Sequence, residues 1–216
     1  MPYRRTPNVV RRLAARERAI VYAALRLAAE GGLQAVHIAA VAGRARIAAG
    51  TVYRYFPAKT GLVAAVIASV SAREIAAMRA AADAAPGPLS AIAAGIATLA
   101  ARALAERRLI WAVTAEPVEP ELDVLRLDFR QALAAELAVR IDAAVSRALL
   151  PQQDPRVTAP ALIGAVIEGL LGPLAPSYAE AAAAREAVQT ATLLVLRALG
   201  VIDPRARGLV VQAALP

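Results

Sequence analysis

Apolar residues recur at the three- and four-residue spacing of an α-helix along most of this chain. The first periodic stretch runs from Asn8 to Glu30, and the Gly31-Gly32 pair is expected to end it. Its predicted buried stripe consists of Ile20, Ala23, Ala24, Leu27 and Ala28. The pattern therefore predicts a long amphipathic helix at the amino-terminal end of the sequence.

The segment Val36–Lys59 has the pattern of two short helices joined by a tight turn. Ile38, Val41, Ala42 and Ala45 line one face of the first helix, and a break follows near Arg46-Ile47. The second helix carries Val52 and Phe56 four residues apart, and Pro57 ends it because proline disfavours a helical residue before it. Two short helices joined in this way form a helix-turn-helix unit.

The rest of the chain predicts further helices separated by proline-containing breaks at Ala84–Pro88, Glu116–Leu122 and Pro151–Pro155. The expected helices cover residues 58–83, 89–107, 109–115, 122–150, 158–178 and 181–199. With the three helices before them, they make an all-α protein of about nine helices. A hydrophobic content of 59% with only 4% aromatic residues also favours helices over a sheet.

Charge divides the chain into two parts. Residues 1–60 carry eleven Lys and Arg against two acids, a balance of +9, whereas residues 61–216 have a balance of −1. We therefore expect a DNA-binding domain over 1–60, including a basic arm with Arg4 and Arg5, and a second helical domain over 61–216. Such an uneven charge is typical of a nucleic-acid-binding head on a neutral body, although a solvated charged face is the plain alternative.

A mean hydropathy of +0.52 calls for a test of membrane insertion. The longest uncharged run, Ala84–Ala101, is cut by Pro86-Gly87-Pro88, which leaves a segment shorter than the ~20 residues of a spanning helix. Residues 157–179 are interrupted by Glu168 and three prolines. No signal peptide is evident, so the sequence predicts a soluble, cytoplasmic protein without a membrane partner.

The helix-turn-helix segment resembles the DNA-binding signature of the tetracycline-repressor (TetR) family. The ordered aromatic triplet Tyr53, Tyr55 and Phe56 makes this resemblance specific, and it covers about the first quarter of the chain. The matching residues are Val41-Ala42, Ala45, Ile47, Gly50-Thr51, Tyr53, Tyr55-Phe56, Lys59 and Leu62.

Three positions depart from the family pattern. Arg46 stands where the family usually has glycine, the residue best suited to a left-handed turn. Ala48 replaces a serine that would cap the second helix, a bond worth about 1 kcal/mol. His37 replaces a threonine that commonly touches phosphate in the family. We expect these changes to affect the turn and the backbone contact.

The resemblance implies that the second helix of the motif enters the major groove of duplex DNA. Arg54 is the residue of this helix that can donate a bidentate pair to guanine, and Lys59 sits at a helix N-terminus that favours phosphate. The full set of expected DNA-binding residues is His37, Arg44, Arg46, Ala49, Gly50, Thr51, Tyr53, Arg54, Tyr55 and Lys59. No second ligand lies near His37, so no metal is expected, and no cofactor is implied.

The resemblance also implies an effector pocket in the second domain and a homodimer. Large or polar residues on otherwise aliphatic helices are candidates for lining the pocket, with plain core packing as the alternative: Met78, Trp111, Thr114, Phe129, Glu168 and Tyr178. In the family the last two helices, here 158–178 and 181–199, pair with their symmetry mates. Leu162, Val166 and Leu170 form one apolar line on the first of these, and Ile163, Ile167 and Leu171 form another. Either a second copy or the chain itself would cover both lines.

These features favour a ligand-responsive transcriptional regulator, a repressor that binds a palindromic operator as a homodimer. An all-helical enzyme is disfavoured because the chain has no Cys, one His and no paired carboxylate motif. A helical interaction protein or a membrane-surface protein, whose basic quarter meets acidic lipid, is the remaining alternative.

Overall fold

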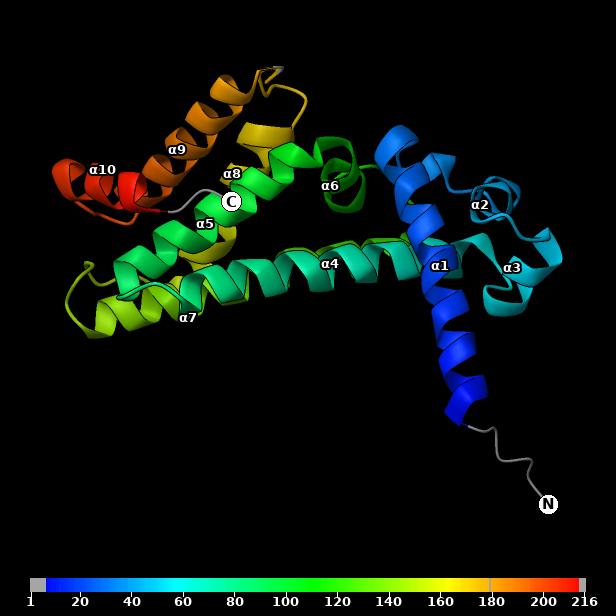
Figure 1. Ribbon diagram of the computed structural model, residues 1–216. Coiled ribbons are helices and arrows are strands. Elements are labelled where there is room, and N and C mark those ends of the chain that lie inside the picture. The colour runs from blue at the N-terminus through cyan, green and yellow to red at the C-terminus, as the bar shows by residue number, and fades with distance from the viewer. Residues whose placement is uncertain (1–6, 179, 214–216) are drawn as a thin grey trace.

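The computed structural model describes residues 7–178 and 180–213, and the Arg4-Arg5 pair lies outside them. Within these ranges the chain forms ten α-helices, one short 3-10 helix and no strand. A small head of α1–α3 stands at one end of an elongated molecule and a body of α5–α10 at the other, with α4 reaching between them (Figure 1). The helices are α1 Pro7–Gly31, η1 Leu33–Ala35, α2 Ile38–Ala45, α3 Ala49–Tyr55, α4 Lys59–Asp83, α5 Pro88–Ala105, α6 Arg107–Thr114, α7 Pro120–Ser146, α8 Pro155–Leu171, α9 Ala181–Ala198 and α10 Asp203–Gln212.

The head folds around the stripes that the sequence predicts. Ile20 and Ala24 of α1, Val41 of α2 and Val52 of α3 are fully buried, and Phe56 closes the same core. The first residues of α4 complete the core with Leu62 and Val63. The predicted helix-turn-helix is therefore confirmed as a three-helix unit whose short helices are stabilised by packing rather than by their own length.

The centre of the body is α5, which packs against α4, α7, α8, α9 and α10. The predicted stripe of Ile92, Ile96, Leu99 and Ala103 is buried there. By length and composition α4 and α5 could each cross a membrane, but 61% of the apolar window of α5 is buried inside the body, as in a core helix of a soluble protein. The head and the body share α4, so a shift of this helix moves one relative to the other.

Three predicted boundaries in the body are wrong by three residues or more. Helix α7 ends at Ser146 rather than Leu150, because Ala148 takes a left-handed backbone and the N–H of Leu149 bonds back to the carbonyl of Ala144. Helix α8 spans Pro155–Leu171 rather than 158–178. It begins early because the Asp154 side chain caps it, and it ends early because Pro173 cannot continue it.

The sequence pattern did not predict α10, Asp203–Gln212. This helix follows a loop with Gly200 in a left-handed conformation and begins with an Asp-Pro pair. The Asp203 carboxylate accepts hydrogen bonds from Arg207 of α10 and from Arg197 of α9. These bonds hold the pKa of Asp203 below its usual range. Buried Ala206 is the main apolar contact of α10, which explains why its periodicity is weak.

Candidate nucleic-acid interface and body cavities

The outer face of α3 presents the side chains expected to read DNA. Tyr53 is 52% exposed and Arg54 is exposed beside it, whereas Tyr55 is half-buried and packs against the head core. The Arg54 guanidinium lies 5.7 Å from the centroid of the Tyr55 ring, which is within cation–π range. Ala49 and Gly50 are exposed and small, so nothing bulky stands between the start of α3 and a groove.

The turn between α2 and α3 takes the left-handed conformation that glycine normally supplies. Arg46 has φ 53° and ψ 47°, and the N–H of Ile47 bonds to the carbonyl of Ala42 across the turn. A side chain in this region costs about 1–2 kcal/mol relative to right-handed backbone. The turn geometry is thus kept despite the arginine, and the Arg46 side chain is exposed next to α3.

Arg44, at the end of α2, is held by Glu30 of α1. Both terminal nitrogens of the guanidinium bond to the carboxylate, at 2.6 Å each. These bonds lower the pKa of Glu30 and raise that of Arg44. The pair fixes the orientation of Arg44 on the head surface and engages two of its five N–H donors, one on each terminal nitrogen.

Helices α2 and α3 of the head and the helix that follows them, α4, begin without a side-chain cap. The N-cap residues are His37 for α2, Ala48 for α3 and Ala58 for α4, and none of the first turns holds an acid. Uncapped N–H groups and the helix dipole favour an anion at each of these ends. Half-buried Lys59, the first residue of α4, adds a positive charge at the third end.

The six residues predicted to line the effector pocket do not line one common cavity in the structure. Thr114 and Phe129 line the same enclosed cavity, of about 10 Å³, between α4, α5, α6, α7 and α8. Met78 lines another small cavity beside α5, and Tyr178 lines an open groove. Trp111 packs half-buried against the core, and Glu168 is exposed on α8.

A buried carboxylate that the sequence pattern did not single out lines the enclosed cavity. Glu74 of α4 is 2% exposed and accepts two bonds from Arg102 of α5, at 2.7 and 3.0 Å. Arg73 donates to the same carboxylate at 2.7 Å and to Glu106 at 2.7 Å. The bonds to Glu74 raise the pKa of Arg102. This network fixes α4 against α5 at the wall of the cavity.

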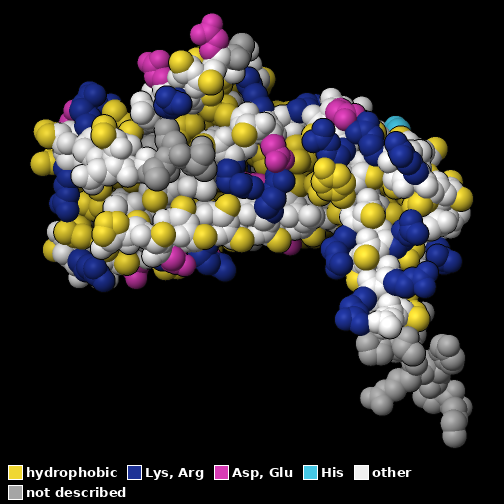
Figure 2. All heavy atoms as spheres, viewed as in Figure 1, with side chains coloured by type: hydrophobic (Ala, Val, Ile, Leu, Met, Phe, Trp, Pro, Cys, Tyr) yellow, Lys and Arg dark blue, Asp and Glu magenta, His cyan; other side chains and the backbone are white. Residues whose placement is uncertain are grey.

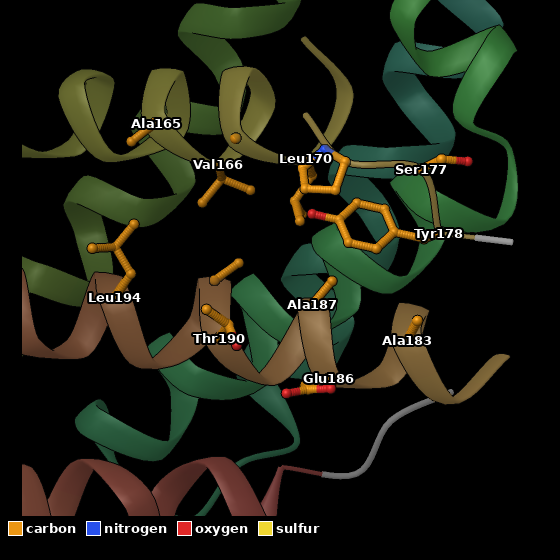
Figure 3. Close-up of a pocket in the computed structure, with 13 residues that line it drawn as sticks. Ala165, Val166, Leu170, Ser177, Tyr178, Ala183, Glu186, Ala187, Thr190 and Leu194 are labelled. Atoms are coloured by element: carbon orange, nitrogen blue, oxygen red, sulfur yellow. The ribbon is translucent and has the colours of Figure 1, made fainter. Parts of the chain in front are cut away.

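The groove that contains Tyr178 lies between α8 and α9 and has a volume of about 430 Å³. Figure 3 shows Val166 and Leu170 projecting into it from α8 and Leu194 standing on the α9 side. The Tyr178 ring closes one end. An apolar groove of this size between two helices is suited to a ligand or to side chains of another protein.

Both predicted apolar lines of α8 are covered by the chain itself, since all six of their residues are buried in one protomer. These lines therefore do not by themselves require a second copy. The residues that α8 leaves exposed are Arg156, Val157, Pro160, Ala161, Ala165, Glu168 and Gly169. Most of these are small, which permits close approach of another helix.

The head touches the body through α6 as well as through α4. Arg108 donates to the carbonyl of Gly31 at 3.2 Å and pairs with Glu116 at 3.1 Å. The Glu116 carboxylate also accepts the N–H of Leu33. Gly32 lies between these groups with φ 76°, and a Cβ at this residue would stand 2.0 Å from the Arg108 guanidinium and 2.4 Å from the Glu116 carboxylate. Helix α6 also carries Thr114 into the enclosed cavity, so it connects the cavity wall to the head.

The head is similar in sequence to part of a family of bacterial regulatory proteins. Residues 20–66 match the model of the family described as bacterial regulatory proteins, tetR family. The HTH-type transcriptional repressor KstR of Rhodococcus jostii is 54% identical over 44 residues, which are 20% of this chain and 21% of KstR. KstR of Mycobacterium tuberculosis is 50% identical over 44 residues, 20% of each chain. The match thus spans about a fifth of the length of these repressors.

Solved structures share the fold over nearly the whole chain. RolR in complex with resorcinol has a TM-score of 0.67 at 19% identity and covers 96% of this chain and 98% of its own. FadR of Bacillus subtilis with stearoyl-CoA has a TM-score of 0.69 at 15% identity, over 86% of this chain and 98% of its own. FadR of Bacillus halodurans has a TM-score of 0.73 at 17% identity, and the match covers 92% of this chain and 100% of that FadR chain. At such identities the likeness is one of fold.

Proposed function

We propose that this chain, by its amino-terminal domain a member of the tetR family of bacterial regulatory proteins, is a ligand-responsive repressor of transcription. It binds a palindromic operator as a homodimer in the cytoplasm, acts as a regulator rather than an enzyme, and leaves the operator when a small molecule binds the body. The observation that carries the proposal is the exposed face of α3, which presents Tyr53 and Arg54 within residues 1–60, a segment with a charge balance of +9.

Each expected DNA contact has a distinct task. Arg54 donates to a guanine edge, Thr51 and Tyr53 contact the backbone near α3, and Arg46 contributes positive charge from the turn. Lys59 and the uncapped start of α4 hold a phosphate. With few base-reading side chains, part of the specificity comes from the shape of the duplex.

The homodimer forms through α8 and α9. Exposed Ala165 and Gly169 of α8 and exposed Thr190 and Leu194 of α9 lie on the two sides of the groove, and a second copy covers them. Sedimentation of Ala165→Glu tests this interface, because a carboxylate placed among small residues at a helix contact lacks a partner. Ala76→Glu, the same change at an exposed position of α4, is the matched control. Monomers from the first variant and dimers from the second are expected; dimers from both would contradict the interface.

The effector enters the enclosed cavity lined by Thr114, Phe129 and Glu74. A volume of about 10 Å³ holds at most a water molecule, so an organic ligand must move the surrounding helices apart. Helix α6 is the wall that also touches the head, through its own Arg108 and through Glu116 in the loop that follows it. A ligand that displaces α6 therefore changes the position of the head and favours a conformer that fits the operator poorly. The FadR and RolR complexes with stearoyl-CoA and resorcinol support a ligand site in this fold.

Selection of bound sequences from random duplex DNA tests the function. Enrichment of one palindrome, bound by two chains and weakened by salt, is expected. Thermal-shift screening of apolar compounds, followed by release of the selected duplex, then tests the effector. Enrichment of no sequence would contradict the proposal, and so would a saturating body ligand that leaves DNA affinity unchanged.

A further inference from the structure

A second, chemically different groove lies at the junction of head and body. It has a volume of about 570 Å³ and is formed by α1, by Arg73 of α4, and by the end of α5 with the start of α6. The apolar part of its surface comes from Leu25, Ala29, Leu104, Ala105 and Leu109. Helix α6 lies on the opposite side of α1 from α2 and α3 (Figure 1), so this groove is separate from the proposed DNA-reading face.

The lining of this junction groove is strongly basic. Four guanidinium groups, those of Arg26, Arg73, Arg107 and Arg108, stand against one carboxylate, that of Glu106. Lys and Arg side chains gather on both sides of the junction in the view of Figure 2. This charge favours an anionic ligand over a neutral one.

Two of the four arginines form no salt bridge among the described residues, although the Glu30 carboxylate interacts electrostatically with Arg26 from the same helix. Arg73 and Arg108 pair with carboxylates, but Arg26 and Arg107 have none within 4.0 Å in the part of the chain that the structure describes. Arg107 instead donates to the carbonyl of Pro176 at 3.1 Å and lies 6.0 Å from the centroid of the Tyr178 ring. Their charge is therefore available to a bound anion.

The start of α6 adds an independent argument. Arg107 and Arg108 are its first two residues, no acid lies in its first turn, and its N-cap residue Glu106 makes no side-chain cap bond. Cations at the positive end of a helix dipole are unfavourable, and an anion there relieves the repulsion. The amide groups of this turn and the arginines of the groove point to the same kind of ligand.

We propose that the junction groove binds a small molecule that carries a phosphate or pyrophosphate group together with an aromatic or apolar part. Arg26, Arg107 and the start of α6 hold the phosphate oxygens. The Tyr22 ring, 65% exposed at the rim, and the apolar floor contact the rest of the molecule. This site is distinct from the effector cavity of the proposed function, and it joins α1 of the head to α6 of the body.

Isothermal titration of the full-length protein with inorganic pyrophosphate and with ATP tests the site. One ligand per chain is expected, and Arg26→Glu should weaken pyrophosphate binding by about tenfold or more, as for the loss and reversal of a charged contact. Arg205→Glu, the same change at an exposed position of α10 outside both proposed sites, is the control and should leave the affinity unchanged. Equal pyrophosphate affinity of the Arg26→Glu and Arg205→Glu variants would overturn the proposal, and so would no saturable binding by the wild type.

Tyr22→Ala tests the aromatic part. ATP should bind the wild type more tightly than pyrophosphate, and Tyr22→Ala should remove that difference while pyrophosphate binding stays the same. Equal affinity of the wild type for the two ligands would contradict the role of Tyr22. Operator binding by the ligand-free wild type is measured in parallel. A protein that binds DNA but no pyrophosphate contradicts this site alone, and one that binds pyrophosphate but no DNA contradicts the proposed function alone.

Discussion

Glu116, in the loop just after α6, accepts a hydrogen bond from the backbone N–H of Leu33 in the head, with the donor and acceptor 3.4 Å apart. The Glu116 carboxylate is buried and also forms a salt bridge with Arg108. The acceptor of the hydrogen bond from Leu33 is therefore a charged group. This hydrogen bond joins two residues 83 positions apart, and Glu116 follows Thr114 by two residues. This contact links the cavity wall to the head.

Replacing Glu116 with alanine should loosen that link. The variant leaves the Leu33 N–H and the Arg108 guanidinium without their partner, which should cost about 1–2 kcal/mol of unfolding free energy. Urea unfolding measures the loss, with Glu119→Ala, an exposed neighbour, as the control. DNA release by an effector should also need more ligand in the variant. Unchanged stability together with an unchanged release curve would show that the contact transmits nothing.

Replacing Glu74 with alanine should be more costly. The change leaves Arg102 and Arg73 without their shared carboxylate, and removal of one partner from a buried pair is strongly destabilising. Both arginines are about a third exposed, so we expect a loss of about 2–3 kcal/mol rather than the full value for a fully buried pair. Chemical denaturation measures it against Glu186→Ala, an exposed acid on α9. Equal stability of the two variants would contradict a structural role for Glu74.

Ala148→Gly should stabilise the protein. Ala148 has φ 54°, where a Cβ is unfavourable, and glycine removes this strain. Glycine also loses more backbone entropy on folding, so the net gain in unfolding free energy is about 0.5–1 kcal/mol. Ala135→Gly, in the middle of α7 with ordinary helical backbone, should instead destabilise by about 0.5–1 kcal/mol. Melting temperatures of the two variants should therefore move in opposite directions. A fall in both would show that the turn after α7 does not store this strain.

Glu30→Gln should tighten DNA binding. Removing the carboxylate releases the Arg44 donors for a phosphate, and each added phosphate contact steepens the dependence of log affinity on log salt by about one. Glu17→Gln also removes one acid from the head but lacks an ion pair with Arg44. Salt titrations of both variants separate release of Arg44 from a general gain in charge. Identical slopes for the two variants would exclude a special role for the pair.

Local patterns predicted the head well. The three- and four-residue spacing from Ile38 to Phe56 and the break at Pro57 depend on neighbours within a few residues, so the helices could be placed from the sequence. The family pattern also marked Arg46 as the position that needs a left-handed residue, and the structure has φ 53° there. Arginine is an unusual residue for this position, but the sequence pattern still indicates that the turn needs a left-handed backbone there.

The body was harder to predict because its decisive contacts are not local. The burial of Glu74 depends on Arg102, 28 residues away, whereas Glu168 drew attention as a lone charge and is exposed. Periodicity shows that the two apolar lines of α8 must be buried, but it does not show which helices bury them. Burial by a second copy and burial by the chain itself therefore both fit the sequence pattern. Helix α10 escaped prediction because a single buried residue, Ala206, leaves almost no apolar period.

The central claim is that the exposed face of α3 binds duplex DNA, and fluorescence anisotropy with a selected palindrome tests it most directly. Arg54→Ala and Tyr53→Ala should each weaken binding by at least about 1 kcal/mol, the scale of a base or backbone contact. Arg185→Ala, an exposed arginine on α9, should bind like the wild type. If both α3 variants bind the palindrome as tightly as the wild type and the Arg185 variant, the account is contradicted.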